Sequence, residues 1–195
     1  MVETIITDPQ ANRDKIIEDM VRELLIHIGE DPNREGLVDT PKRVTKMMHE
    51  LLAGYNQEPE EVLSATFKSD CNEMVVVREI AFASICEHHA LPFTGTVDIG
   101  YIPNGIVVGI SKLVRLVEVF ARRLQIQENM TSQIADNFYR IIKPHGVMVK
   151  VTARHMCMSM RGVKNAHSEM VTSAVRGSFE QPEVKSEFLK LCEKK

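Results

Sequence analysis

Tryptophan is absent from the 195-residue sequence, and aromatic residues make up only 5% of it. No apolar run approaches the roughly 20 residues of a membrane-spanning helix, so we expect no membrane association. The first residues lack the basic-then-apolar pattern of a signal peptide, which predicts a cytoplasmic protein. The formal net charge of −3 excludes a generally basic nucleic-acid binder. An anionic ligand would therefore need a local basic patch.

Cysteine is also scarce, and its spacing is informative. The four cysteines include no Cys-x-x-Cys pair, and this absence argues against a zinc-dependent nucleobase deaminase. Two of them lie in clusters with histidine, whereas Cys71 and Cys192 have no such company. We interpret Cys71 and Cys192 as free thiols in a reducing compartment.

Two amphipathic helices are predicted at the N-terminus. Helical spacing covers residues 12–28, followed by Gly29 as a C-terminal cap. The second helix is expected to begin with Thr40 as its N-cap and to reach Gly54. We predict an N-terminal helical appendage over residues 1–60, joined to the rest by the Pro- and Glu-containing stretch 56–61.

The second predicted domain, residues 61–195, carries its strands in blocks. Strands are expected over residues 74–85, 93–101, 106–110, 147–152 and 171–179. Helices are expected over residues 113–120, over residues 134–142 after Thr131 as N-cap, and over residues 182–192. Blocks of strands, rather than strict alternation with helices, favour an α+β fold with an antiparallel sheet.

Two clusters combine cysteine with histidine: Cys86-Glu87-His88-His89 and His155-Met156-Cys157. Thiolate and imidazole are ligands that Zn²⁺ prefers, and three of the five candidates suffice to hold it. A three-ligand zinc keeps a position for water, which is typical of catalysis, and the surplus histidines would then carry protons. The alternatives are a closed structural site with a fourth ligand, and a buried cysteine beside unrelated histidines.

The spacing within each cluster limits how it can bind. Cys86 and His89 can share a metal only if the chain turns, and Pro92 supports a break in the strand there. His155 and Cys157 are two residues apart and are expected on one face of a strand. The ligand type favours Zn²⁺ and is also compatible with Fe²⁺ or Mn²⁺.

Basic and acidic groups follow at other places in the chain. Ser111 and Lys112 begin the first central helix, where free N–H groups favour an anion, and Arg115 follows one turn later. Arg161 closely follows the second metal cluster. The carboxylate of Glu128 would suit the paired N–H donors of a guanine edge.

Together these residues resemble a known family. The segments that carry the resemblance are Cys-Glu-His-His (86–89), Gly-Ile-Ser-Lys-Leu (109–113), Gln-Ile-Gln-Glu (125–128), His-Met-Cys-Met (155–158), Met-Arg-Gly-Val (160–163), Val-Thr-Ser (171–173) and Asp-Thr-Pro-Lys-Arg-Val (39–44). In this order they are similar to GTP cyclohydrolase I of the zinc type, over nearly the whole chain.

The resemblance implies an architecture and an assembly. Family members have the tunnelling fold (T-fold), in which antiparallel sheets of several subunits form a barrel with helices outside. They are typically toroidal decamers of two facing pentamers, with active sites at subunit interfaces. Burial against partner subunits would suit a chain without tryptophan.

The resemblance also implies roles for residues. Cys86, His89 and Cys157 match the zinc ligands, whereas His88 and His155 match the catalytic histidines. The substrate contacts that it implies are Glu128 for the guanine ring with Gln127 beside it, Ser111, Lys112, Arg115 and Arg161 for ribose and triphosphate, and Arg43 for phosphate. Asn129 departs from the arginine that many relatives carry after the Gln-Glu pair.

The implied reaction is the hydrolytic opening of the imidazole ring of GTP. Formate is released, and rearrangement and ring closure give 7,8-dihydroneopterin triphosphate. The chain would then be a hydrolase of cyclic C–N bonds at the first step of pterin or tetrahydrofolate biosynthesis. One rival is a non-enzymatic, zinc-stabilised oligomer. Another is a T-fold nitrile reductase of the queuosine route, which would lack the Cys-His-His grouping.

Overall fold

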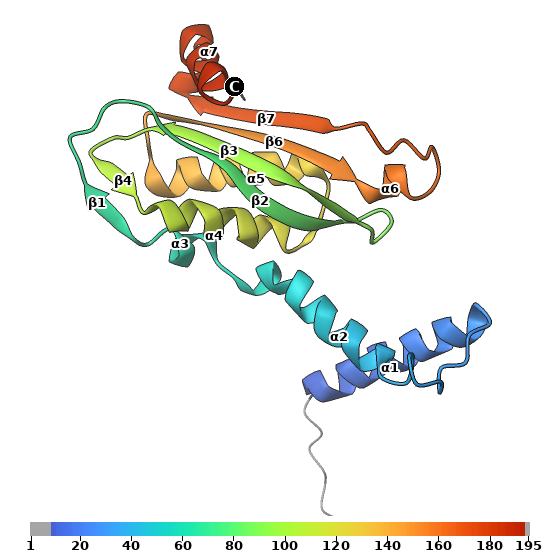
Figure 1. Cartoon of the computed structure of the whole chain (residues 1–195). Helices are drawn as coiled ribbons and strands as arrows, with labels where there is room; N and C mark the ends of the chain where they lie inside the picture. Colours follow the sequence, from blue (N-terminus) through green and yellow to red (C-terminus); the bar gives the residue numbers. More distant parts are fainter. Residues whose placement is uncertain (1–8, 194–195) are drawn as a thin grey trace, which may run out of the picture. The chain divides into compact units, whose positions relative to one another are not determined.

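The structure of the protein is a computed structural model that describes residues 9–193. The chain divides into two compact units, with the division between Leu51 and Leu52. In the first unit, α1 (Pro9–His27) packs against α2 (Thr40–Leu51) (Figure 1). Gly29 has a φ of 87°, which agrees with the predicted glycine cap of α1. None of the helices in the described residues has the length and apolar character needed to cross a bilayer.

The segment after α2 is more ordered than a plain linker. The helix ends at Leu51 and not at Gly54, and a 3₁₀ turn, η1 (Ala53–Asn56), follows. A short helix, α3 (Pro59–Val62), occupies part of the predicted connection over residues 56–61. Pro59 suits the first turn because its φ is already helical, and the two glutamates beside it complement the helix dipole.

A five-stranded sheet forms the centre of the second unit, in the order β5-β2-β3-β6-β7. Its strands are β2 (Val75–Cys86), β3 (Pro92–Ile102), β5 (Leu124–Gln125), β6 (Gly146–His155) and β7 (Met170–Gly177). The four long strands are antiparallel, and β5 adds a short parallel edge beside β2. The strands β1 (Thr66–Lys68) and β4 (Ile106–Val108) make a separate two-stranded sheet. The α+β class and the antiparallel sheet are therefore confirmed.

Two helices cover one face of the five-stranded sheet, α4 (Ile110–Ala121) and α5 (Gln127–Ile142) (Figure 1). Alternation along β6 explains the packing, because Val147, Val149 and Val151 all point into this core and are fully buried. The predicted helix pair on the sheet is confirmed. Two boundaries were wrong: Ile110 begins α4 instead of extending β4, and α5 begins at Gln127 instead of after Thr131.

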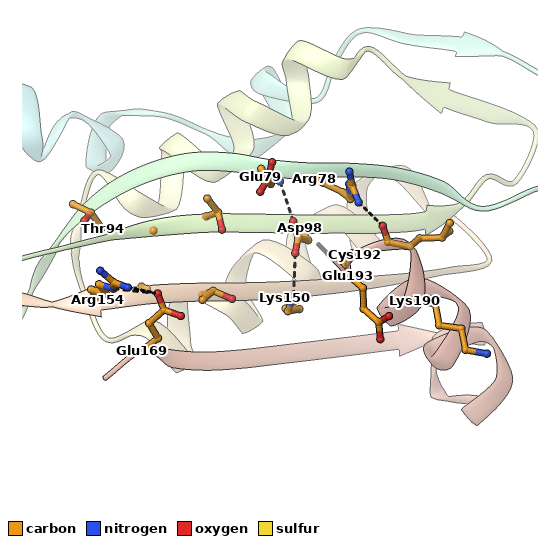
Figure 2. A pocket seen from close by; sticks show the side chains of 15 residues that line it. Arg78, Glu79, Thr94, Asp98, Lys150, Arg154, Glu169, Lys190, Cys192 and Glu193 are labelled. Carbon is orange, nitrogen blue, oxygen red and sulfur yellow. Dashed lines mark hydrogen bonds and ion pairs between the residues drawn. The ribbon is translucent and has the colours of Figure 1, made fainter. Parts of the chain in front are cut away.

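The other face of the sheet is only partly covered. The turn η2 (Ser178–Glu180) and helix α7 (Pro182–Leu191) supply Phe179 and Phe188, which pack on Met148 in a second small core. Beyond them lies a recess of about 1460 Å³ whose lining includes the Asp98–Lys150 ion pair of 3.3 Å (Figure 2). None of the predicted site residues lines this recess, so the candidate site lies elsewhere.

Candidate metal centre and active site

A tight turn at the end of β2 places the first two candidate ligands. Cys86 is the last residue of β2, and both of its backbone groups form hydrogen bonds with the turn. Its N–H donates to Leu91 O, and its carbonyl accepts from the Ala90 N–H, each at 2.9 Å. Ala90 has a φ of 52°, a conformation that costs an L-residue about 1 kcal/mol or more. The turn brings His89 back over Cys86, as the spacing predicted.

The third candidate ligand comes from a short helix and not from a strand. Strand β6 ends at His155, and Cys157 lies in α6 (Met156–Ser159). The expectation that His155 and Cys157 share one face of a strand was therefore wrong. The helical turn, closed by the Met160 N–H on Met156 O at 3.0 Å, swings Cys157 out of the strand's alternation and toward the β2–β3 turn.

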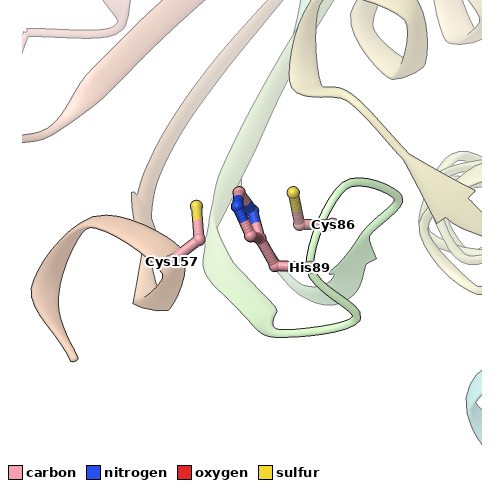
Figure 3. Close-up of side chains that lie close together, drawn as sticks. All are labelled: Cys86, His89 and Cys157. Carbon is pink, nitrogen blue, oxygen red and sulfur yellow. The ribbon is translucent and has the colours of Figure 1, made fainter. Parts of the chain in front are cut away.

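Cys86, His89 and Cys157 converge on one point (Figure 3). One ligand atom from each lies within 4.8 Å of the others. Ligand atoms around one tetrahedral zinc are roughly 3.5–3.8 Å apart, given bonds of about 2.0–2.3 Å, so side-chain adjustments of about 1 Å would close the set. Among the described residues no fourth His, Cys, Asp or Glu joins the group. Two thiols and one imidazole fit a zinc ion with one position left open.

The electrostatics of this trio depend on burial and on Arg161. Burial raises the pKa of the Cys157 thiol, and the nearby Cys86 raises it further, whereas Arg161 acts in the opposite direction. The guanidinium of Arg161 also donates to His89 Nε2 at 3.1 Å. Because a cysteine binds a metal as its thiolate, binding of a cation would release the protons of the two thiols.

His88 lies at the rim of the trio. Its ring is exposed, its Nδ1 is 3.9 Å from Cys86 Sγ, and its Nε2 is 3.9 Å from the Glu87 carboxylate. It is therefore placed beside the candidate metal without being one of the three converging ligands.

His155 is fixed more firmly than His88. Its ring stacks on Phe93 with centroids 4.6 Å apart and an angle of 4° between the planes. Its Nε2 is 2.9 Å from the side-chain oxygen of Gln127, the first residue of α5. Burial lowers the pKa of His155, and the neighbouring Glu128 carboxylate partly opposes this shift. The imidazole is thus held between a sheet residue and a helix N-terminus.

The predicted anion-binding residues of α4 lie far from the trio within one chain. Val108, just before α4, donates its N–H to Tyr101 Oη, and Tyr101 pairs with Val75 at the start of β2. The trio lies at the other end of β2, which is 12 residues long and so spans roughly 35 Å. Ser111, Lys112 and Arg115 therefore begin their helix at the opposite end of the sheet (Figure 1).

Arg43 belongs to the first unit and is described there by itself. Its guanidinium donates to Thr40 Oγ1 at 2.9 Å and to Gly36 O at 3.1 Å, and more than half of its side chain is exposed. Of the predicted site residues, the second unit thus brings together the trio, His88, His155, Gln127, Glu128 and Arg161.

Sequence reasoning missed three residues that support this group. Phe93 reads only as an apolar strand residue, and its place under His155 depends on the β3–β6 register that pairs them. Thr131 and Thr172 share a 2.6 Å hydrogen bond beside Gln127. The Val-Thr-Ser segment contained Thr172, but nothing in its spacing revealed the partner.

These features define the class of the protein as mixed α+β, with a candidate three-ligand metal centre beside an oriented histidine. The chain belongs to the GTP cyclohydrolase I family, whose model matches residues 17–193.

Three curated relatives named GTP cyclohydrolase 1 illustrate the family match. The protein of Wolinella succinogenes is 58% identical over 166 residues, 85% of this chain and 89% of the relative. That of Dehalococcoides mccartyi is 52% identical over 185 residues, 93% and 98% of the two chains. That of Bacillus pumilus is 54% identical over 166 residues, 85% and 88% of the two chains.

Among solved structures, the apo archaeosine synthase QueF-Like matches with a TM-score of 0.45 and 19% identity, over 54% of this chain and 94% of that one. This likeness is too weak to support an argument.

Proposed function

We propose that the chain catalyses the GTP cyclohydrolase I reaction, the hydrolytic opening of the guanine imidazole ring of GTP with release of formate and closure to 7,8-dihydroneopterin triphosphate. The observation that carries this proposal is the convergence of Cys86, His89 and Cys157 beside an oriented His155. It is supported by family membership over residues 17–193 and by relatives of this name at 50–58% identity. The T-fold is the architecture that we infer from the same family.

The trio would hold the metal, which we propose to be Zn²⁺ because two thiolates and an imidazole suit it best. When bound, zinc lowers the pKa of a water at its open position and polarises a neighbouring C=N or C=O group. Within residues 9–193 the converging group offers three ligands and no fourth, which favours this catalytic arrangement over a closed structural site.

The protein side chains would bind the substrate and move its protons. His155, fixed between Phe93 and Gln127, is placed to protonate the imidazole nitrogen of the purine, and the exposed His88 serves a second proton transfer. Glu128, in the first turn of α5, would accept from the N–H donors of the guanine edge. Arg161, already in contact with His89, would bring positive charge to the phosphate side.

The site would be completed by a second copy of the chain. Within one chain, Ser111, Lys112 and Arg115 begin a helix at the far end of β2 from the trio. If these residues bind triphosphate, as we propose, they must come from a neighbouring subunit. A homo-oligomer with sites between subunits, such as a decamer of two pentamers, satisfies this geometry. The same arrangement gives Arg43 a place as a phosphate contact.

The test is to incubate metal-replete protein with GTP and to measure three quantities in the same sample. These are formate, pterin fluorescence after oxidation, and bound metal. We expect equal amounts of formate and pterin, and one zinc for each chain. A Lys112→Ala variant mixed with a His155→Ala variant should recover activity in hybrid oligomers, since each supplies the half that the other lacks. Metal-replete protein that releases no formate from GTP would overturn the proposal.

A further inference from the structure

Gln127 makes contacts that do not fit a residue whose side chain binds substrate. Only 1% of its surface is exposed, although it is the first residue of α5 and next to the exposed Glu128. Its amide nitrogen lies 3.2 Å from Val151 O, 3.0 Å from Met170 O and 3.1 Å from Thr172 Oγ1. The whole amide is thus occupied by the protein.

These contacts determine which way the amide points. Two of the three neighbours of the nitrogen are backbone carbonyls, which only accept hydrogen bonds. Exchanging the amide oxygen and nitrogen would set acceptor against acceptor at both, in a buried place where an unsatisfied group costs about 1–3 kcal/mol. The Gln127 oxygen must therefore be the atom that faces His155 Nε2 at 2.9 Å.

The orientation of the amide in turn determines the tautomer of His155. The Gln127 oxygen can only accept, so Nε2 of His155 has to carry a hydrogen. In the neutral ring the lone pair is then on Nδ1, since one nitrogen donates and the other accepts. A ring turned by 180° would keep the stack on Phe93 but would place a ring carbon opposite the amide oxygen, so the hydrogen bond to Gln127 selects this orientation.

The hydroxyl groups of two threonines hold Gln127, and the donor and acceptor of each of their hydrogen bonds can be assigned. The hydroxyl of Thr131 donates its single hydrogen to the backbone carbonyl oxygen of Gln127 at 2.7 Å. The 2.6 Å contact between Thr131 and Thr172 must then be donated by Thr172. The lone pairs of Thr172 remain to accept from the Gln127 amide. The two hydrogens of the Gln127 amide nitrogen are shared among three acceptors, and the hydroxyl hydrogen of each threonine has one, so every donor of the network is satisfied.

We propose that Gln127 is a positioning residue that keeps a hydrogen on Nε2 of His155 and leaves Nδ1 as the ring nitrogen that takes up a proton and passes it to the substrate. The proposal deepens the cyclohydrolase function and rests on it for the role of the substrate. It replaces the direct contact with GTP that the sequence resemblance implied for Gln127.

The kinetic test compares two buried glutamines. Gln127→Met keeps the side-chain length and removes the amide. We expect kcat to fall about 10- to 100-fold, by analogy with the loss of the hydrogen-bond partner of a metal-bound histidine, while KM for GTP changes less than about twofold. Gln125→Met is the matched control, because Gln125 is also buried and bonds Phe120 O and Gln133 without touching His155. Its kcat should stay within about twofold of wild type.

Three kinetic outcomes would overturn the assignment. The first is a raised KM with unchanged kcat in Gln127→Met, which would mean uniform binding of the substrate by Gln127. The second is an equal loss of kcat in both variants, which would mean a general packing effect. The third is no loss of kcat in either variant.

A spectroscopic test does not depend on turnover. In metal-replete protein labelled with ¹⁵N-histidine, a His155→Asn variant identifies the His155 signals, and solid-state NMR distinguishes protonated from unprotonated ring nitrogens. At about pH 8, where histidine rings are neutral, wild-type His155 should carry its hydrogen on Nε2, and Gln127→Met should shift the population toward Nδ1–H. An Nδ1–H ring in wild type overturns the inference even if formate is made. Wild type without formate overturns the proposed function even if Nε2 is protonated.

Discussion

The stack between Phe93 and His155 makes a prediction that separates stability from turnover. Phe93 is fully buried, touches Phe82 edge-on with centroids 5.7 Å apart, and lies flat against His155. Phe93→Leu removes both ring contacts, whereas Phe82→Leu removes only the contact that the two phenylalanines share. Comparison of the two variants therefore isolates the effect of the stacking contact between Phe93 and His155.

Both variants should lose stability, and Phe93→Leu should lose more because it removes two ring contacts. One aromatic pair contributes about 0.5–1.5 kcal/mol beyond its burial, and the smaller leucine leaves a partly filled space. We expect a loss of about 2 kcal/mol for Phe82→Leu and about 3 kcal/mol for Phe93→Leu, which lowers Tm by about 4–8 °C and about 6–12 °C in a chain of this length. Thermal unfolding should be compared at one protein concentration, because association shifts Tm.

Turnover should distinguish the two variants sharply. A displacement of about 1 Å at a reacting group can cost about 100-fold, so Phe93→Leu should lower kcat about 10- to 100-fold with zinc content unchanged. Phe82→Leu should keep kcat within about twofold. Formate release with metal analysis on the same samples measures both quantities. Equal kcat in the two variants would refute the idea that the stack orients His155.

Three further outcomes are expected. His155→Ala should keep zinc and lose turnover, whereas Cys157→Ala should lose both, and stoichiometric zinc in the latter would contradict the ligand assignment. Burial raises the pKa of Cys192 to about 11, above its value of about 8.5 in an unfolded chain. The folded protein therefore holds this proton more tightly, and its stability should fall as pH rises from about 9 to 11. Thermal unfolding measured across this pH range should show a shallower fall in Cys192→Ala. In Gly95→Ala the new Cβ would lie 1.9 Å from Thr152 O, forcing β3 from β6; urea unfolding should show a loss of about 3 kcal/mol or more, and unchanged stability would contradict this packing.

The sequence predicted those parts of the site that depend on short-range signals. Cys86 and His89 are separated by a turn, and the turn was inferred from their spacing and from Pro92 after them. The strands β2, β3 and β6 were found because their segments are rich in β-branched and apolar residues and are bounded by Gly and Pro. The three-residue β1 was not predicted, since a segment of that length has no period to read.

Other parts depended on tertiary structure. Cys157 was expected on a strand, but the chain becomes helical directly after His155. The N-cap position of this helix is His155, which makes no side-chain capping hydrogen bond, so the sequence contains no signal for the helix start. Thr131 resembled an N-cap, yet tertiary packing extends α5 by a turn and buries Thr131 beneath Gln127. The support of Phe93 for His155 follows from strand register, which a local pattern does not specify.

A metal held by Cys86, His89 and Cys157 would link folding to metal supply. His89 belongs to the turn between β2 and β3, whereas Cys157 follows β6, so the ligands meet only after these strands have paired. An ion that binds the native state alone would stabilise it by about 2.7 kcal/mol at a free concentration 100 times its Kd. Scarcity of the metal would thus reduce the amount of folded protein as well as the activity of each molecule.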